Sequence, residues 1–187
     1  MPHYITRQRK NEIKDVVIGI FEKCCICSLP VKLGTITKTY GIRCLKMDAV
    51  AARTSSASAS KDGYTIKSGS GYIIMYNPSQ ISARTRFTVA CQLAHIFLGH
   101  LNRGTSNEQT DAEAIYFACE LLMPLSVLDS YGCRSAGDIA ARCGVSLAAA
   151  QIRSRDFIRR DRYKRLNGET DYDMRFLNCF FGGGHAE

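Results

Sequence analysis

Cys91 and His95 are the residues of this 187-residue chain whose types and spacing most directly suggest chemistry. They stand four positions apart in a segment with helical character, so both side chains would project from one face of a helix. A cysteine thiolate and a histidine imidazole are both ordinary zinc ligands, with bonds of about 2.3 Å and 2.0 Å respectively. The pair could therefore hold a metal ion if further ligands lie close by.

Gln92 follows Cys91 directly, which makes the segment 91–95 an altered form of the zinc-binding pattern HExxH. In that pattern two histidines one helical turn apart bind zinc, and the glutamate acts as general base on the metal-bound water. Gln92 takes the place of this glutamate. A glutamine amide can hydrogen-bond a water but cannot accept its proton near neutral pH. Because general-base assistance is worth about 10²–10⁴-fold in rate, the glutamine predicts impaired or absent hydrolysis.

The helix that carries this pattern is expected at residues 82–100, and a second long helix is expected at 107–123. The first is apolar on nearly every face, and such a helix lies buried in the centre of its domain. Burial requires that Gln92 and His95 find hydrogen-bond partners or coordinate something. His100 is expected at the helix end, hydrogen-bonded to backbone or water.

The segments that precede these helices predict two further helices and a small sheet. Apolar residues recur at helical spacing at 6–28 and again at 30–40, where Gly41 suits the end of a helix. Three short runs predict strands, the last two joined by the hairpin sequence Ser-Gly-Ser-Gly: 42–47, 64–67 and 71–76. The Ser- and Ala-rich stretch 54–60 is expected to be a mobile loop and a candidate flap.

Three motifs follow one another along the chain: YIIMYNP at 72–78, then RFTVACQLAHIFLGH at 86–100, then DAEAIYFACELLMP at 111–124. Their order resembles that of the ImmA/IrrE metallopeptidase family. That family typically shows RFTLAHELGHxxLGH followed by ExEANxFAxxLLMP, and the likeness covers about residues 29–157. The resemblance implies an α+β fold, mainly helical and zincin-like, with a small three-stranded sheet and a C-terminal helical segment.

The resemblance assigns site residues one by one. It places the first zinc histidine at Cys91, the catalytic glutamate at Gln92, the second zinc histidine at His95 and the acidic third ligand at Asp111, of which only His95 is unchanged. Zinc held by Cys91, His95 and Asp111 with one water is chemically acceptable, although aspartate reaches less far than glutamate. The alternative is a vestigial pocket whose polar groups are merely hydrogen-bonded. Glu113 is expected on a different helix face from Asp111, a poor position for a substitute base.

The segment 136–155 has a helix-turn-helix pattern, with Gly144 at the turn and Ser146 at the start of its second helix. That second helix would present Gln151, Arg153 and Arg155, side-chain types that read bases or phosphates. Seven basic residues against two aspartates at 153–165 add to this basic character. DNA binding through 136–165 is therefore one interpretation. A solvated helix face is the other, and the family resemblance implies packing of this helical pair against the peptidase domain.

Two functions of different class follow. The first is an ImmA/IrrE-like protein with impaired or absent catalysis, which regulates a repressor or mobile element by binding a protein partner or by residual proteolysis of a peptide. The second is a helix-turn-helix DNA-binding regulator. We expect an N-terminal helix at 1–28, a zincin-like domain at 29–134 and a helical extension at 135–187. The sequence contains no uninterrupted apolar stretch of about 18 residues, so we expect no membrane span. Its nine cysteines, an odd number, fit reduced thiols, and we expect the protein in the cytoplasm.

Overall fold

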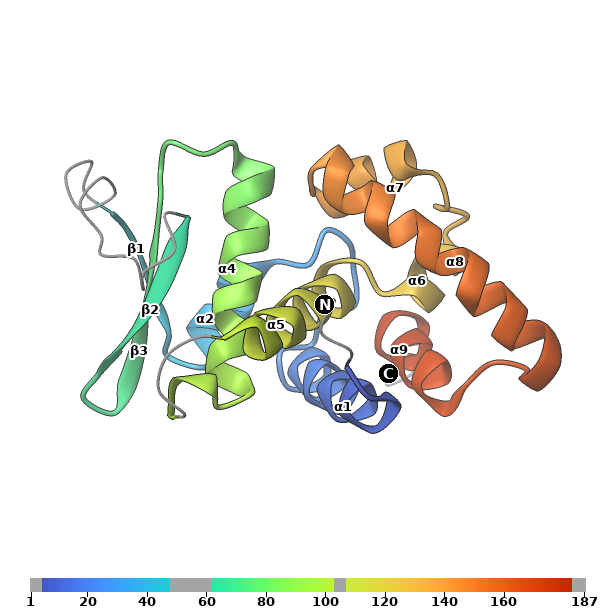
Figure 1. The fold of residues 1–187 in the computed structure, drawn as a ribbon, viewed down its shortest axis with the longest axis horizontal. Helices are drawn as coiled ribbons and strands as arrows, with labels where there is room; N and C mark the ends of the chain where they lie inside the picture. The colour runs from blue at the N-terminus through green and yellow to red at the C-terminus, as the bar shows by residue number, and fades with distance from the viewer. Residues whose placement is uncertain (1–4, 48–61, 103–106, 183–187) are drawn as a thin grey trace, which may run out of the picture.

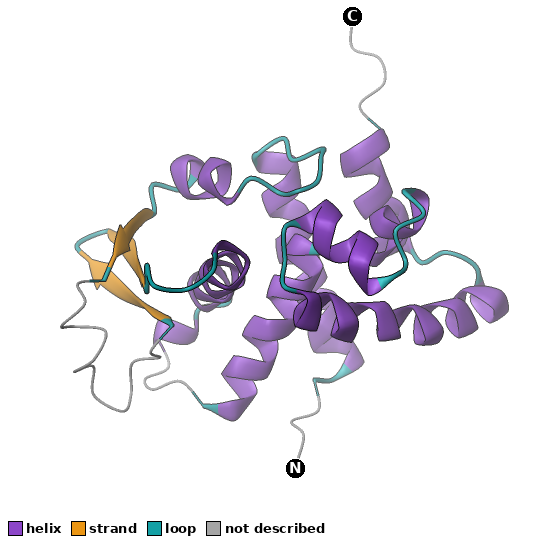
Figure 2. Ribbon diagram, turned by 90° about the horizontal axis from the view of Figure 1, so that it is seen from above, coloured by secondary structure: helices purple, strands orange, loops and turns teal. Residues whose placement is uncertain are grey.

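A computed structural model of the chain describes residues 5–47, 62–102 and 107–182. A small sheet stands at one side of the molecule, with the helix α4 beside it, and the remaining helices extend away from the sheet (Figure 1). The view from above shows the same order, with all three strands at one edge (Figure 2). The predicted α+β class is confirmed, and most of the described chain is helical.

The first two helices form where the apolar spacing predicts them. Helix α1 spans Arg7–Lys23, and the Thr6 hydroxyl accepts a hydrogen bond from the backbone N–H of Arg9 at its start. Its apolar face packs against α5 and α9, where the Phe21 ring meets two phenylalanine rings of α9 edge-on. Helix α2 spans Leu33–Thr39 and ends before Gly41, whose φ of 64° suits a turn out of a helix.

The sheet has three strands in the order β1-β3-β2. Strands β2 (Gly63–Ser68) and β3 (Gly71–Tyr76) form the predicted antiparallel hairpin, and β1 (Arg43–Lys46) runs parallel to β3. Gly63 is buried where β2 begins, and a Cβ atom built on it would lie 2.7 Å from Thr88 Cγ2 and 2.8 Å from the Met75 carbonyl oxygen. The Thr88 side chain of α4 therefore packs directly on the backbone of β2 at this point. The candidate flap at 54–60 lies outside the described residues.

Helix α4 spans Ser82–Phe97 and packs against β2, β3 and α5. The sequence predicted that it would continue to His100, and this was wrong by one turn. Gly99 adopts a φ of 70°, a left-handed conformation that stops an α-helix, and His100 begins a short 3-10 turn, η1, at His100–Asn102. Helix α5 spans Glu108–Leu122 and starts at a capping box in which Asn107 and Thr110 bond reciprocally.

Four helices complete the fold: α6 (Leu125–Ser130), α7 (Ala136–Cys143), α8 (Leu147–Asn167) and α9 (Asp171–Phe181). The predicted turn between α7 and α8 is confirmed, because Gly144 ends α7 in the left-handed conformation and Ser146 caps α8. No helix in the described ranges is both long and apolar enough to cross a membrane. The expected division of the chain at residues 28 and 134 stays a prediction.

Candidate functional site

Helices α4 and α5 bring the predicted site residues His95 and Asp111 together. The two helices pack along each other, and His95 Nε2 lies 4.0 Å from Asp111 Oδ1. Asp111 stands in the first turn of α5, directly after the capping box that fixes where this helix begins. The pairing of these two helices is therefore what positions the side chains of the altered HExxH pattern.

Cys91 lies one turn before His95 on α4. Burial, together with the neighbouring thiol of Cys119 and the carboxylate of Asp111, raises the pKa of its thiol to about 12. The thiol is therefore protonated at neutral pH. A cysteine binds zinc as the thiolate, so zinc binding at this position would release the thiol proton.

Gln92 points away from this pair, toward the sheet. Thr65 Oγ1 donates a hydrogen bond to Gln92 Oε1 at 2.9 Å, and Gln92 Nε2 donates to the Gly63 carbonyl at 3.3 Å. The expectation that a buried Gln92 must find partners is confirmed. Both ends of the amide are occupied by β2, so the side chain at the general-base position ties the motif helix to the edge strand.

A chain of polar side chains leads from His95 into the protein. His95 Nδ1 lies 3.0 Å from His100 Nδ1, and His100 Nε2 lies 3.1 Å from Glu113 Oε2. Arg9 Nη2 then donates to the same carboxylate oxygen at 2.7 Å. His100 was expected to bond backbone or water, and this was wrong, because its two ring nitrogens bond the side chains of His95 and Glu113. The left-handed turn at Gly99 folds His100 back toward α4, which helical spacing alone did not indicate.

This chain fixes one proton on His100. The Glu113 carboxylate only accepts, so His100 Nε2 carries the proton of that bond. Burial and the neighbouring His100 lower the pKa of His95, against the opposing charge of Asp111, so His95 is neutral at neutral pH. The bond between the two Nδ1 atoms holds one proton, and the tautomers decide which ring donates it. A second histidine thus orients the ring much as carboxylates do behind zinc-bound histidines.

Glu113 is the acid that anchors the chain. Burial alone would raise its pKa, but hydrogen bonds from Arg9, Gln109 and His100 outweigh burial and lower the pKa to about 2. Its orientation toward Arg9 and His100 agrees with the expectation that it lies on a different helix face from Asp111. Fully committed to these donors, it is a weak proton acceptor and a poor replacement for a base at position 92.

The family resemblance implies a zinc ion, which needs at least three protein ligands close together. Within the described ranges, no group of three His, Cys, Asp or Glu side chains is placed to hold a metal. His95 and Asp111 form a pair of suitable donors, but the Cys91 thiol does not complete a group of three with them. As arranged, these donors do not fit a zinc ion. Cys91, His95 and Asp111 remain a predicted ligand set.

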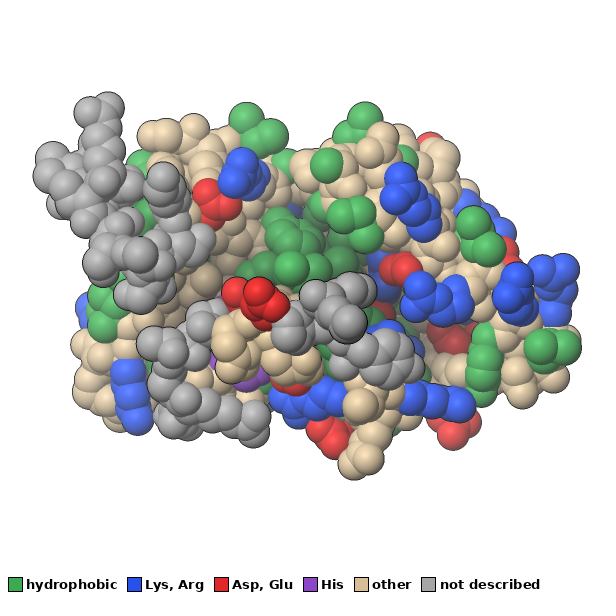
Figure 3. Space-filling view, in the orientation of Figure 1, with side chains coloured by type: hydrophobic (Ala, Val, Ile, Leu, Met, Phe, Trp, Pro, Cys, Tyr) green, Lys and Arg blue, Asp and Glu red, His purple; other side chains and the backbone are tan. Residues whose placement is uncertain are grey.

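The surface beside these helices is hollowed. Figure 3 shows a depression in the middle of the face viewed, between the side of the molecule formed by α4 and the side formed by α7 and α8. Hydrophobic side chains line the depression, and acidic side chains lie next to it. A shallow apolar hollow of this kind suits contact with another polypeptide.

The turn between α7 and α8 is hydrogen-bonded to helix α4. Arg86 on α4 donates from Nε to the Cys143 carbonyl at 3.1 Å and from Nη2 to the Val31 carbonyl. The Gly144 turn packs directly on the Arg86 side chain. The arginine that begins the RFT motif therefore holds the α7–α8 turn in place.

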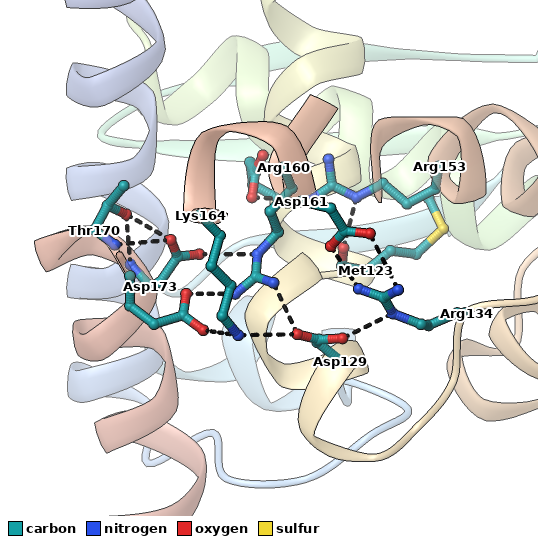
Figure 4. Close-up of polar contacts among 11 residues, drawn as sticks. Met123, Asp129, Arg134, Arg153, Arg160, Asp161, Lys164, Thr170 and Asp173 are labelled. Atoms are coloured by element: carbon teal, nitrogen blue, oxygen red, sulfur yellow. Dashed lines mark hydrogen bonds and ion pairs between the residues drawn. The ribbon is translucent and has the colours of Figure 1, made fainter. Parts of the chain in front are cut away.

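Arg153 is buried, so the prediction that it reads bases or phosphates was wrong. Its side chain is 2% exposed, its Nε donates to the Met123 carbonyl at 2.7 Å, and its Nη2 lies 2.9 Å from Glu120 Oε2. Figure 4 shows the side chain directed at Met123. A buried arginine must be paired, and the local helical pattern placed Arg153 on α8 without indicating its partner Glu120 on α5. Gln151 and Arg155 are exposed as expected.

The fold and the site together define a zincin-like metallopeptidase domain: a small mixed sheet, a motif helix packed on it, and a second helix that brings an acid to the motif histidine. A family model for the IrrE N-terminal-like domain, peptidase family M78, matches residues 38–155. The chain belongs to this family. A comparison with curated proteins found no match.

Proposed function

We propose that this protein is a catalytically impaired member of its family that acts by binding a protein partner, in the control of a repressor or of a mobile element. The observation that carries the proposal is the position of Gln92. Its amide is bonded at both ends to β2, through Thr65 and Gly63, and it has no basicity. The general-base step of the HExxH mechanism therefore has no residue to perform it at this position.

The metal chemistry of the family supports the same conclusion from a second direction. Zinc in this family would be held by the motif helix and the first turn of α5, and it would activate water. Among the described residues of this chain, no three His, Cys, Asp or Glu side chains come together as such a ligand set. What the site retains is an oriented, neutral His95 beside Asp111, which can accept and donate hydrogen bonds to a bound polypeptide.

Metal content and peptidase activity test the loss of catalysis. We expect purified protein to hold well under one zinc per chain and to cleave no peptide library. Zinc would be measured beside Cys91→Ala and His95→Ala, with Cys119→Ala as the matched control, since Cys119 is a neighbouring buried thiol outside the predicted ligand set. Zinc at one per chain, lost in the first two variants and kept in the control, would restore a metal site. Peptide cleavage by the unaltered protein would refute the proposal.

Restoring the motif separates the two defects. The double variant Cys91→His with Gln92→Glu rebuilds HExxH, while Gln92→Glu alone restores only the base. If both defects contribute, activity appears in the double variant alone. Activity in Gln92→Glu alone would place the whole defect in the base.

The regulatory role calls for a test without assumed proteolysis. The chain would be co-expressed with the repressor encoded nearest to it, and both repressor length and operator occupancy would be measured. We expect operator release with intact repressor. Release accompanied by repressor fragments would contradict a binding role, and unchanged occupancy would remove the repressor from consideration.

DNA binding is a second candidate because of α8. The turn between α7 and α8 has helix-turn-helix geometry, and Arg155 and Arg162 are exposed and form no ion pair in the described part of the chain. Cationic contacts to phosphates give affinity that falls steeply with salt. Duplex affinity that drops with salt and with Arg155→Gln would favour this function. Since Arg153 is buried, its mutation is not a valid probe of DNA contact.

A further inference from the structure

A cavity of about 620 Å³ lies between α1, α5, α8 and α9, and it is lined by none of the residues of the altered HExxH pattern. Volumes of 300–1,000 Å³ are typical of small-molecule sites. One wall is the face of α1 that carries Arg7, Lys10 and Lys14 at i, i+3 and i+7. The facing wall is α8, and Tyr116 of α5 and Ser126 of α6 lie between them.

The lining is rich in charge of both signs, with an excess of positive charge. Seven cationic side chains line the cavity against five carboxylates. Figure 3 shows blue and red side chains gathered on the part of the surface formed by α8 and α9. The excess predicts attraction for an anion, provided that the carboxylates already have partners.

Four of the five carboxylates already have ion-pair partners within the protein. Glu120 and Asp156 both pair with Arg153, the former at 2.9 Å. On the α9 side, Arg160 pairs with Glu169 at 2.6 Å and with Asp173 at 3.4 Å. Figure 4 shows Arg160 directed at Asp173 and at Asp129. Arg153 and Arg160 therefore serve the protein's own acids.

Three cations of the lining have no ion pair among the described residues. Arg7 and Lys14 lie over the rings of Tyr163 and Tyr172, at 5.6 Å and 5.5 Å from the centroids. Arg159 is exposed on α8 and has no charged partner in the described ranges. These groups come from two helices on opposite sides of the cavity and can approach a single multivalent anion.

Ser126 provides a second, independent sign of a ligand. Its residue is 2% exposed, it lines the cavity, and its Oγ has no hydrogen-bond partner among the described residues. Buried hydroxyl groups are nearly always paired, so this donor calls for a bonded group. An acceptor oxygen inside the cavity would satisfy it.

We propose that this cavity binds a phosphate-bearing small molecule. A phosphate group offers several acceptor oxygens and more than one negative charge, which matches Arg7, Lys14 and Arg159 together with the Ser126 hydroxyl. The volume accommodates a molecule of nucleotide size. The site is separate from the motif helix, so the proposal does not depend on whether the protein hydrolyses peptides.

Calorimetric titration of the full chain with ADP and with inorganic pyrophosphate tests the proposal. We expect saturable binding of at least one probe with one site per chain. Lys14→Gln and Arg159→Gln should each weaken it by about tenfold, since each removes a charge-assisted contact. Tighter binding of ADP than of pyrophosphate would identify an organic phosphate as the ligand, and equal binding would identify the phosphate group alone.

The matched control is Arg162→Gln, because Arg162 is an exposed arginine on the same helix and does not line the cavity. Its affinity for the probe should equal that of the unaltered protein. Equal weakening by Arg162→Gln and Arg159→Gln would show attraction by overall charge and overturn the proposal. Absence of binding by either probe at millimolar concentration, with folding verified by circular dichroism, would also overturn it.

Discussion

Helix α5 carries two buried carboxylates seven residues apart, and their surroundings differ. Glu113 receives bonds from Arg9 and His100 and is thereby connected to His95 on the motif helix. Glu120 instead pairs with Arg153 of α8. Burial would raise the pKa of Glu120, but the charge of Arg153 lowers it. One carboxylate thus holds the site helix to the N-terminal helix, and the other holds the C-terminal helix to the same scaffold.

The motif positions of helix α4, in contrast, carry no charged side chain at neutral pH. Cys91 is a protonated thiol, Gln92 is an amide and His95 is neutral, while both carboxylates of α5 remain ionised and paired. The side chains at the motif positions are uncharged, whereas the two carboxylates that join helices are ionised. The ion pairs that hold these helices together therefore do not require a metal.

The largest effect is expected at the Arg153 and Glu120 pair. Arg153→Met leaves a buried carboxylate without its partner and should lower the free energy of unfolding by about 3–5 kcal/mol. Urea denaturation measures it, with the exposed Arg155→Met expected within about 0.5 kcal/mol of the unaltered protein. Adding Glu120→Leu to Arg153→Met should recover much of the loss. A cost below about 1 kcal/mol for Arg153→Met would show that the pair does not hold α8 in place.

The Glu113 chain should be nearly as sensitive, and its effect depends on pH. The folded pKa of about 2 lies below the ordinary value of 4.5, so this group stabilises the protein above pH 4.5 and loses that contribution as pH falls toward 2. The full contribution is about 3 kcal/mol by linkage. Glu113→Gln should lower stability at neutral pH and flatten this part of the profile. The half-exposed Glu12→Gln is the control, and identical profiles for the two variants would contradict the assignment.

A smaller effect is expected where the motif helix meets the sheet. Gln92→Glu replaces the amide donor that faces the Gly63 carbonyl by a carboxylate oxygen, so one hydrogen bond becomes a repulsion. We expect a loss of about 1–3 kcal/mol at neutral pH, because a buried acceptor loses its donor. Thermal denaturation at neutral and acidic pH measures it, and protonation of the new side chain should recover part of the loss. Equal stability at both pH values would mean that Gln92 is not held by β2 in solution.

The smallest effect is expected at the surface, which sharpens the contrast with the buried pairs. Asp161→Asn removes the 2.6 Å contact to Arg134, whose side chain is 46% exposed and also bonds Asp129. Exposed pairs contribute about 0–1 kcal/mol, and salt screens them. Denaturation at low and high salt should therefore give similar values for both proteins. A loss as large as that of Arg153→Met would remove the distinction between buried and exposed pairs.

The sequence predicted the elements that depend on local chemistry. The helix starts at Ser146 and near Asn107, the turn at Gly144 and the hairpin at 68–71 follow from side chains that act within a few residues. Family motifs then indicated the approach of His95 and Asp111, which the structure confirms as a 4.0 Å contact. These features need no knowledge of distant neighbours.

The polar partners of the site could not be predicted in the same way. Arg9 and Glu113 are 104 residues apart in the chain, and Gln92 and Thr65 are 27 apart. Arg153 shows the limit most clearly, because its helical position gives no sign of the buried Glu120 on another helix. Gly99 was expected to end α4, and its left-handed conformation does so, but the helix stops about one turn before the expected bound at His100.

The crowded backbone at Gly63 limits how this protein can evolve. A side chain at this position would meet Thr88 and the Met75 carbonyl at less than 3 Å, while Gly34 and Gly137 have only open space or ordinary contact distances around them. In a saturation library selected for folded protein, position 63 should retain glycine alone, whereas the other two should accept alanine. The packing of the motif helix on the sheet thus depends on the absence of a side chain at position 63.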